Sequence, residues 1–227
     1  MTQTAMSAPD KLAVDNMLSD QDEIARLLVA TGAVTVATEE RWRFGSGLPS
    51  PMYVDNRRLL SLVPARRRVR EALDRRVRAD VEAEGINVVV GVPTGGLPWA
   101  AWLADDLGLP LVYVRPAPKD RGLGKQIEGI LPENARALVL DDLVTTGQST
   151  AVAIHPLRAA GAEVLAVVSI FTYGMPAAAR LFAGLGVRHF AVTDLDAVLR
   201  IGAECFSPEE CRAVENWRTD RLMGYEG

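Results

Sequence analysis

The sequence predicts an α/β protein in which a parallel β-sheet is flanked by helices and a small cap, or hood, covers one end. From Pro64 onward, short apolar runs alternate with longer stretches of helical periodicity. The short runs are continuously apolar, which is typical of strands buried on both faces. Because alternating strands and helices build parallel sheets, and 227 residues suit one large domain, we expect a single α/β core with an appended cap.

The first 63 residues are expected to form a tail and most of the cap. Residues 1–18 show no sustained period, so we expect a disordered tail. Residues 19–63 begin with a helix that is capped by Ser19 and ends at Gly32. The mixture of β-branched, aromatic, glycine and proline residues that follows predicts short antiparallel strands joined by turns.

Residues 64–205 are expected to form the α/β core. A proline suited to the first helical turn opens a helix that carries an apolar residue every fourth position and stops at Gly85. Five strands and three further helices follow, with a polar loop between the second and third strands. The expected strands are 86–92, 111–115, 135–142, 163–171 and 187–193, and the helices are 98–108, 149–161 and 176–186.

Residues 206–227 are expected to form a last helix that returns to the cap. Ser207 is a suitable N-cap, Pro208 follows it, and Glu210 completes a capping box.

Composition argues against several classes of protein. A net charge of −4 and 6% aromatic residues do not favour nucleic-acid binding, which needs a basic face with stacking side chains. The stretch that holds the arginines between residues 66 and 76 has acids interspersed, which favours a solvated helix face over a nucleic-acid patch. No apolar run approaches the roughly 20 residues of a membrane span, and the polar N-terminus lacks a signal sequence, so we expect a cytoplasmic protein. Cys205 and Cys211 alone do not make a zinc site, and we expect reduced thiols.

The stretch LVLDDLVTTGQST, residues 138–150, places two adjacent acids at the end of an apolar strand. Leu138 to Leu140 are expected to finish the buried part of the strand, and the hydroxyl and glycine residues after the acids lead into a helix. Helix N-termini at the carboxyl ends of parallel strands favour anions, so this loop predicts a phosphate site. Asp141 and Asp142 would repel a phosphate, which indicates that they face sugar hydroxyls or a developing positive charge. A ribose 5-phosphate satisfies both demands; alternatively, the two acids are ordinary turn residues that cap the helix.

Two common nucleotide motifs are missing. The segment GLGKQ at residues 122–126 fails as a Walker A loop at Gln126, and no G-x-G-x-x-G fingerprint occurs. Nucleoside triphosphates and nicotinamide cofactors therefore lose their main support.

Three segments in order resemble one enzyme family. LVLDDLVTTGQS resembles the motif with which type I phosphoribosyltransferases bind phosphoribosyl pyrophosphate (PRPP). The segment at 91–129, which contains GVPTGG and RPAPKDRGLGKQIEG, and the segment GSGLPSPMYVDNRRLL from residue 45 resemble orotate phosphoribosyltransferases. The resemblance covers about residues 20–205 and implies the type I phosphoribosyltransferase fold.

The resemblance implies transfer of ribose 5-phosphate from PRPP to orotate, giving orotidine 5′-monophosphate and pyrophosphate, in pyrimidine biosynthesis. It implies Mg²⁺ that is bound mainly through PRPP, with Asp141 or Asp142 nearby and no direct side-chain ligand. It also implies a homodimer that shares its catalytic loop across the interface. The residues implied as catalytic are Arg115, Lys119, Asp141 and Asp142. The residues implied to bind PRPP are Thr94, Arg115, Lys119, Arg121, Asp141, Asp142, Leu143, Val144, Thr145, Thr146, Gly147, Gln148 and Ser149.

The glycine-rich segment RPAPKDRGLGKQIEG suits a lid that closes over substrate and excludes water. Arg115 and Lys119 would contact the pyrophosphate; the alternative is a solvated surface loop. Arg121 departs from the family, in which a histidine is usual. A guanidinium can bind phosphate oxygens, but it does not act as a proton donor at neutral pH. His155 and His189 lie outside the motifs and are expected to be structural.

Orotate recognition follows less directly from the sequence. By resemblance, Thr145 meets the orotate ring, and Tyr53 stacks on the pyrimidine or packs in the core. Two family cations are absent, because Gly45 stands where some members have a lysine, and FTYG at 171–174 stands where they have an arginine. A phosphoribosyltransferase for another base, or a regulator that binds PRPP without catalysis, therefore remain alternatives.

Overall fold

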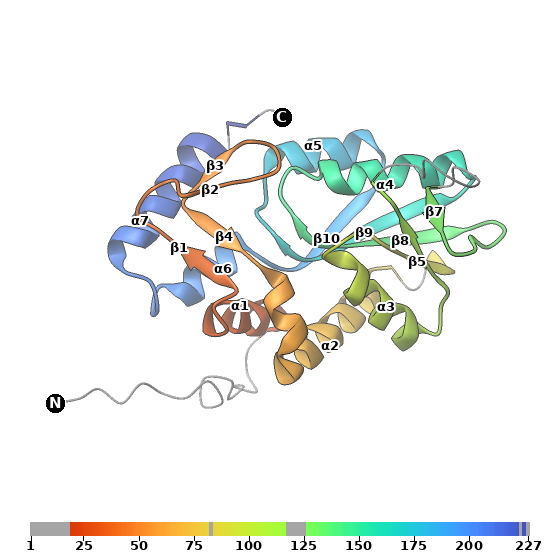
Figure 1. The fold of residues 1–227 in the computed structure, drawn as a ribbon, viewed down its shortest axis with the longest axis horizontal. Helices are drawn as coiled ribbons and strands as arrows, with labels where there is room; N and C mark the ends of the chain where they lie inside the picture. Colours follow the sequence, from red (N-terminus) through yellow and green to blue (C-terminus); the bar gives the residue numbers. More distant parts are fainter. Residues whose placement is uncertain (1–18, 82–83, 117–125, 223, 226–227) are drawn as a thin grey trace.

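The computed structural model describes residues 19–81, 84–116, 126–222 and 224–225. A six-stranded sheet lies at its centre, with helices on both faces (Figure 1). The strands follow the order β10-β9-β8-β5-β6-β7, and every neighbouring pair is parallel except β6 and β7. The predicted fold class is therefore confirmed as α/β with a mostly parallel sheet. The strands are β5 (Val88–Gly91), β6 (Leu111–Val114), β7 (Ile127–Glu128), β8 (Arg136–Val144), β9 (Glu163–Thr172) and β10 (Arg188–Asp194).

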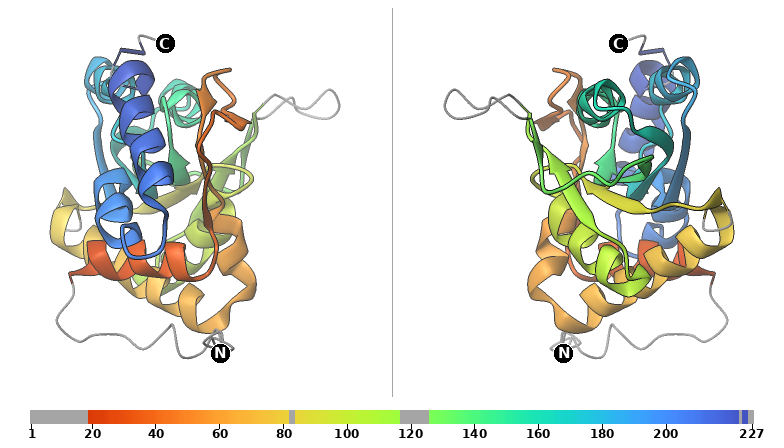
Figure 2. Two further views of the ribbon diagram at one scale, coloured as in Figure 1. Left: turned by 90° about the vertical axis from the view of Figure 1, so that its left-hand side faces the viewer. Right: turned by 90° about the vertical axis from the view of Figure 1, so that its right-hand side faces the viewer.

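Helices sandwich the sheet, as the two side views in Figure 2 show. Helices α2 (Val63–Asp80) and α3 (Gly96–Leu107) cover one face, with α1 (Asp20–Ala30) beside them (Figure 1). Helices α4 (Gln148–Ala159) and α5 (Pro176–Gly184) cover the other face. The α1 helix begins at Ser19, whose side chain accepts a hydrogen bond from the Asp22 backbone N–H, as the sequence predicts.

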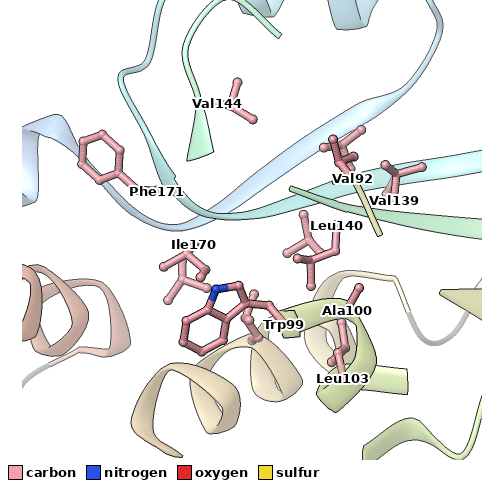
Figure 3. Packing of buried hydrophobic residues seen from close by; sticks show 14 of the residues in the cluster. Val92, Trp99, Ala100, Leu103, Val139, Leu140, Val144, Ile170 and Phe171 are labelled. Atoms are coloured by element: carbon pink, nitrogen blue, oxygen red, sulfur yellow. The ribbon is translucent and has the colours of Figure 1, made fainter. Parts of the chain in front are cut away.

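Buried side chains on both faces of the central strands bind the layers together (Figure 3). Trp99 of α3 is fully buried and lies on the same side of the sheet as Leu140 and Ile170. Val139 and Phe171, the neighbours of those two strand residues, point to the opposite side. Strands that are apolar at every position can bury both faces in this way, which explains the unbroken apolar runs.

The cap consists of two short antiparallel ribbons and a C-terminal helix. β1 (Val34–Val36) pairs with β4 (Met52–Val54), and β2 (Trp42–Arg43) pairs with β3 (Pro49–Ser50), which confirms the predicted antiparallel strands. A 3₁₀ helix, η2 (Asn56–Ser61), joins the cap to α2.

The C-terminal helix α7 (Pro208–Trp217) has the predicted Ser207–Glu210 capping box and is followed by the short helical segment η4 (Arg218–Leu222). Trp217 Nε1 donates a hydrogen bond to the Pro49 carbonyl at 2.7 Å, which ties α7 to the β2–β3 ribbon.

Three details differ from the sequence-based expectations. Within the stretch expected to be a polar loop, Ile127 and Glu128 form an antiparallel edge strand. The β8 strand does not end with the acids at 142 but continues to Val144, because β9 extends beside it and supplies backbone partners. The short helix α6 (Leu195–Gly202), which packs against α1 and β10, was not expected; Asp194 caps it through the Ala197 backbone N–H.

Within the described ranges, no helix is long and apolar enough to cross a membrane.

Candidate active site

A cavity of about 710 Å³ opens where β5 and β8 lie side by side. From β5 the chain passes to β6 on one side, whereas β8 leads to β9 on the other. Loops diverge at such a switch point of the strand order, and ligands of open α/β sheets bind there. The residues after β5, the end of β8, the start of α4 and the cap ribbons together line the cavity.

Asp141 and Asp142 both line this cavity from the end of β8. Successive side chains of a strand point to opposite faces, so the continuation of β8 sends the two acids toward different helices. Asp141 faces the start of α4: its Oδ2 accepts hydrogen bonds from Thr150 Oγ1 at 2.8 Å and Ser149 Oγ at 3.3 Å. Its Oδ1 accepts one from the Asp142 backbone N–H at 2.9 Å. The alternative that the acids are turn residues that cap the helix is wrong, because both lie in β8 and Asp141 accepts from side-chain hydroxyls of α4 rather than from its backbone N–H groups.

Asp142 lies against the turn that precedes α3. A Cβ atom added to Gly95 would stand 2.3 Å from its carboxylate, and one added to Gly96 would stand 2.6 Å from the Leu140 carbonyl oxygen. Only glycine fits these positions, because atoms at those distances overlap. The Asp142 carbonyl accepts a hydrogen bond from Asn56 Nδ2 at 2.6 Å, so the cap holds the backbone of the acid pair.

Burial makes both acids weaker than usual. Desolvation raises the pKa of Asp141, partly offset by its bonds from the hydroxyls of Thr150 and Ser149. Desolvation and the neighbouring Asp141 charge raise the pKa of Asp142 to about 7. Asp142 is therefore poised to change charge near neutral pH.

The loop between β8 and α4 forms the second wall. Of the residues predicted to bind phosphate here, Leu143, Thr145, Thr146, Gln148 and Ser149 line the cavity. Val144 is 1% exposed and packs in the core, so its side chain does not reach a ligand.

Gly147 is the N-cap of α4 and has φ +79°, a conformation that disfavours other residues. None of the described side chains forms a capping bond at this end of α4, which leaves its first-turn N–H groups oriented toward the loop.

The turn after β5 forms the third wall. Val92, Pro93, Thr94 and Gly95 line the cavity, and the Pro93–Thr94 peptide bond is cis. Thr94, one of the predicted PRPP residues, thus shares the cavity with the acid pair. The small residues of the turn leave room for a ligand beside the backbone.

The cap forms the fourth wall, and most of its polar side chains were not singled out from the sequence. Tyr53 lines the cavity as expected, and its ring stacks on Trp42 with centroids 6.2 Å apart. Arg43, Asp55 and Arg57 line the cavity as well. The sequence YVDNRR could have indicated Asp55 and Arg57, because aspartate is a suitable helix N-cap and an arginine follows it two residues later. In the structure Asp55 caps η2 by accepting from the Arg57 backbone N–H, and it also accepts from the Arg57 side chain.

The two family positions that lack a cation differ in their surroundings. Gly45 lines the cavity and offers no side chain. Tyr173 of the FTYG segment is 2% exposed and packs with Phe44 and Trp217, so it supports the cap from behind.

The predicted lid cations are not brought into the cavity by the described residues. Arg115 lies at the base of the β6–β7 hairpin, where its Nη1 is 3.8 Å from Glu128 Oε1, and it is not a lining residue. Lys119 and Arg121 lie outside the described residues. His155 is exposed on α4, and His189 is bonded to Ser169 Oγ at 2.9 Å, away from the cavity.

Comparison with known proteins agrees with this geometry. A family model described as the phosphoribosyl transferase domain matches residues 59–187. The chain is 36% identical over 199 residues to the orotate phosphoribosyltransferase of Lactiplantibacillus plantarum, covering 87% of this chain and 93% of that protein. The crystal structure of orotate phosphoribosyltransferase from Aeropyrum pernix aligns with a TM-score of 0.65 at 35% identity, over 78% of this chain and 97% of that one. The Mycobacterium tuberculosis enzyme in complex with PRPP aligns with a TM-score of 0.59 at 28% identity, over 79% and 98%.

Proposed function

The chain belongs to the orotate phosphoribosyltransferase family of type I phosphoribosyltransferases, and we propose that its cavity joins orotate to PRPP. In this reaction the ribose C1–oxygen bond to pyrophosphate breaks, and pyrophosphate leaves with the bonding electrons. The pyrimidine nitrogen loses its proton to pyrophosphate or solvent and forms a bond to C1. The products are orotidine 5′-monophosphate, an intermediate of pyrimidine biosynthesis, and pyrophosphate. The observation that carries the proposal is the meeting of two adjacent acids, an anion-favouring loop and a glycine turn in one cavity.

Each wall has a part of PRPP that matches its chemistry. The loop of Thr145, Thr146, Gln148 and Ser149 would bind the 5-phosphate at the α4 N-terminus, which favours anions. Asp142, whose carboxylate is free of the hydroxyl bonds that hold Asp141, would accept hydrogen bonds from the ribose hydroxyls. Both carboxylates would stabilise positive charge at C1 as pyrophosphate departs.

The pyrophosphate would lie at the turn of residues 93–96, where small residues allow the backbone to approach. Arg115 and Lys119, with Arg121, would neutralise its growing charge from the lid. Because Arg115 does not reach the cavity in the described structure, we infer that the lid segment moves on substrate binding or acts on the site of a second subunit. The latter would make a homodimer the active form.

Mg²⁺ suits this donor set. Carboxylate oxygens are ligands of Mg²⁺, which usually combines one or two of them with substrate phosphate oxygens. Mg²⁺ bound mainly through PRPP would lie near Asp142, which lines the cavity, and among the described residues no group of three metal-binding side chains occurs. When bound, Mg²⁺ would supply positive charge beside the ribose and pyrophosphate oxygens. The base would lie against Tyr53 and Thr145.

The test mixes the protein with PRPP, Mg²⁺ and orotate and follows the loss of orotate absorbance. Uracil, hypoxanthine and adenine run in parallel. Turnover of another base without orotate would favour a different phosphoribosyltransferase. PRPP binding without turnover of any base would favour a regulator.

The lid assignment has its own test in Lys119→Ala. Loss of a cation that acts mainly in the transition state should lower kcat about a hundredfold while changing the Kd for PRPP much less. Single-turnover kinetics and PRPP titration separate the two effects. A variant with the wild-type rate would refute the assignment.

A further inference from the structure

The cavity needs positive charge at its base-binding end. Its described lining contains three carboxylates, those of Asp55, Asp141 and Asp142, against the guanidinium groups of Arg43 and Arg57. Orotate carries a carboxylate and must enter beside the anionic PRPP. An anion placed next to like charges is repelled unless a cation offsets them. Gly45 and Tyr173 do not supply that cation.

Arg57 is held at the edge of the aromatic part of the cavity. Its Nε donates to Asp55 Oδ1 at 2.6 Å, and its Nη2 donates to Tyr53 Oη at 3.0 Å. These two bonds fix the guanidinium beside the ring that we assign to the pyrimidine. Its Nη1 has no acceptor among the described residues, and its side chain is 54% exposed, so an incoming anion can reach it.

Arg57 also lies close to the ribose end of the site. Its neighbour Asn56 bonds to the Asp142 carbonyl, and the charge of Arg57 lowers the pKa of Asp142 against the larger effect of burial. The hydrogen bond that Arg57 donates to Asp55 raises the pKa of Arg57 itself, so this side chain stays charged. Arg57 thus lies near both the ribose end of the cavity, at Asp142, and the base end, at Tyr53. A base bonded to C1 of the ribose would therefore place its carboxylate beside Arg57.

Arg43 is the other candidate, and its contacts differ. Its Nη1 donates to the Gly47 carbonyl at 3.1 Å within its own hairpin, on the exposed ribbon of β2 and β3. No side chain holds its guanidinium toward Tyr53 or Asp142 among the described contacts. Arg43 thus provides a matched control with the same charge in the same cavity.

We propose that Arg57, positioned by Asp55 and Tyr53, is the specificity-determining cation that binds the carboxylate of the base substrate. This inference rests on the proposed function and identifies the residue that replaces the two missing family cations. The pyrimidine carboxylate would accept from the free Nη1, while Asp55 and Tyr53 keep the guanidinium in the plane that a carboxylate requires.

The experiment compares wild type, Arg57→Gln, Arg57→Lys and Arg43→Gln in steady-state assays. Loss of one charge-assisted hydrogen bond should raise the KM for orotate about tenfold to a hundredfold in Arg57→Gln. The KM for PRPP should change less than about twofold. Because uracil lacks the carboxylate, any uracil turnover should be unaffected, so selectivity for orotate over uracil falls by the same factor as orotate affinity. Arg57→Lys should recover part of the loss, and Arg43→Gln should raise the KM for orotate less than Arg57→Gln does.

Three results would overturn the inference. An unchanged orotate KM in Arg57→Gln would exclude the contact, and a rise confined to the KM for PRPP or pyrophosphate would move Arg57 to the other substrate. A larger effect of Arg43→Gln on orotate would transfer the role to Arg43. If the wild type itself does not consume orotate in the same assay, the proposed function fails before the variants are compared.

Discussion

The charged side chains at the end of β8 and those on the cap, which line different parts of the cavity wall, differ in burial and in pairing. Asp141 is buried and Asp142 half-buried at the end of β8, and desolvation raises the pKa of both. Asp55 and Arg57 are partly exposed on the cap and neutralise each other at 2.6 Å. Burying like charges costs stability, whereas an exposed ion pair contributes little in either direction. The wall that holds Asp141 and Asp142, which would bind the sugar phosphate, therefore lowers the stability of the fold. The wall that holds Asp55 and Arg57, which would bind the base, can change its side chains with little effect on stability.

The strongest test of this contrast adds one methyl group to each wall. Gly95→Ala places a Cβ 2.3 Å from the Asp142 carboxylate and forces it aside, whereas a Cβ at Gly45 has no neighbour within 4 Å. Displacing a reacting group by about 1 Å costs about a hundredfold in rate, so we expect kcat/KM for PRPP to fall by that factor in Gly95→Ala. Gly45→Ala should remain within about twofold. Equal losses in the two variants would show that the walls are equally tight.

The next test measures the cost of the buried charge. The Asp142 pKa is about 7 in the folded protein and about 3.9 when unfolded, so the native state binds more protons between these values. Stability contributed by this group should therefore fall as pH rises from about 4 to 7. Asp142→Asn removes the charge and should stabilise the fold at pH 8 by about 2 kcal/mol while it lowers activity.

Denaturant unfolding of this variant at pH 5 and pH 8 provides the measurement. Asp55→Asn on the cap is the control and should change stability by less than about 0.5 kcal/mol. If Asp142→Asn is destabilising at pH 8, favourable interactions of the ionised carboxylate outweigh its desolvation cost, and the expected cost of the buried charge is wrong.

The smallest expected effect concerns the attachment of the cap. Trp217→Phe keeps an aromatic ring beside Phe44 and Tyr173 but removes the hydrogen bond from Nε1 to the Pro49 carbonyl. We expect a loss of about 1 kcal/mol in unfolding free energy. The KM for orotate should rise severalfold with little change for PRPP, since only the cap wall is loosened. A change in both KM values would indicate that the cap also shapes the sugar-phosphate site.

Much of the core could be predicted from sequence because its signals are local. Apolar runs marked the strands, and capping residues such as Ser19 and Ser207 marked two helix starts. The end of β8 was placed too early, because Asp141 and Asp142 are unusual in strands and only their pairing with the longer β9 keeps them extended. The edge strand of Ile127 and Glu128 is too short to show a period and exists through its partner β6.

In the site as well, residues with a local sequence signal could be predicted, and residues brought in by tertiary contacts could not. The cavity-lining residues of the loop at 141–149 follow one another in the chain, so a single motif indicated them. Arg57 and Asp55 reach the same cavity from the cap, more than 80 positions earlier, and no local pattern links them to the loop. Tertiary contacts such as the bond from Asn56 to the Asp142 carbonyl across 86 positions establish that link.

The switch in strand order has a mechanical consequence. From β5 the chain continues to one flank of the sheet, and from β8 it continues to the other. A molecule bound between the ends of these two strands therefore contacts both halves of the sheet, and it contacts the cap as well. A bound ligand would consequently link these segments, which are otherwise joined mainly by backbone pairing and core packing, and would stabilise them together. Saturating sugar diphosphate at a hundred times its Kd should raise the free energy of unfolding by about 2.7 kcal/mol, and slowed amide exchange should extend to both flanks of the sheet together.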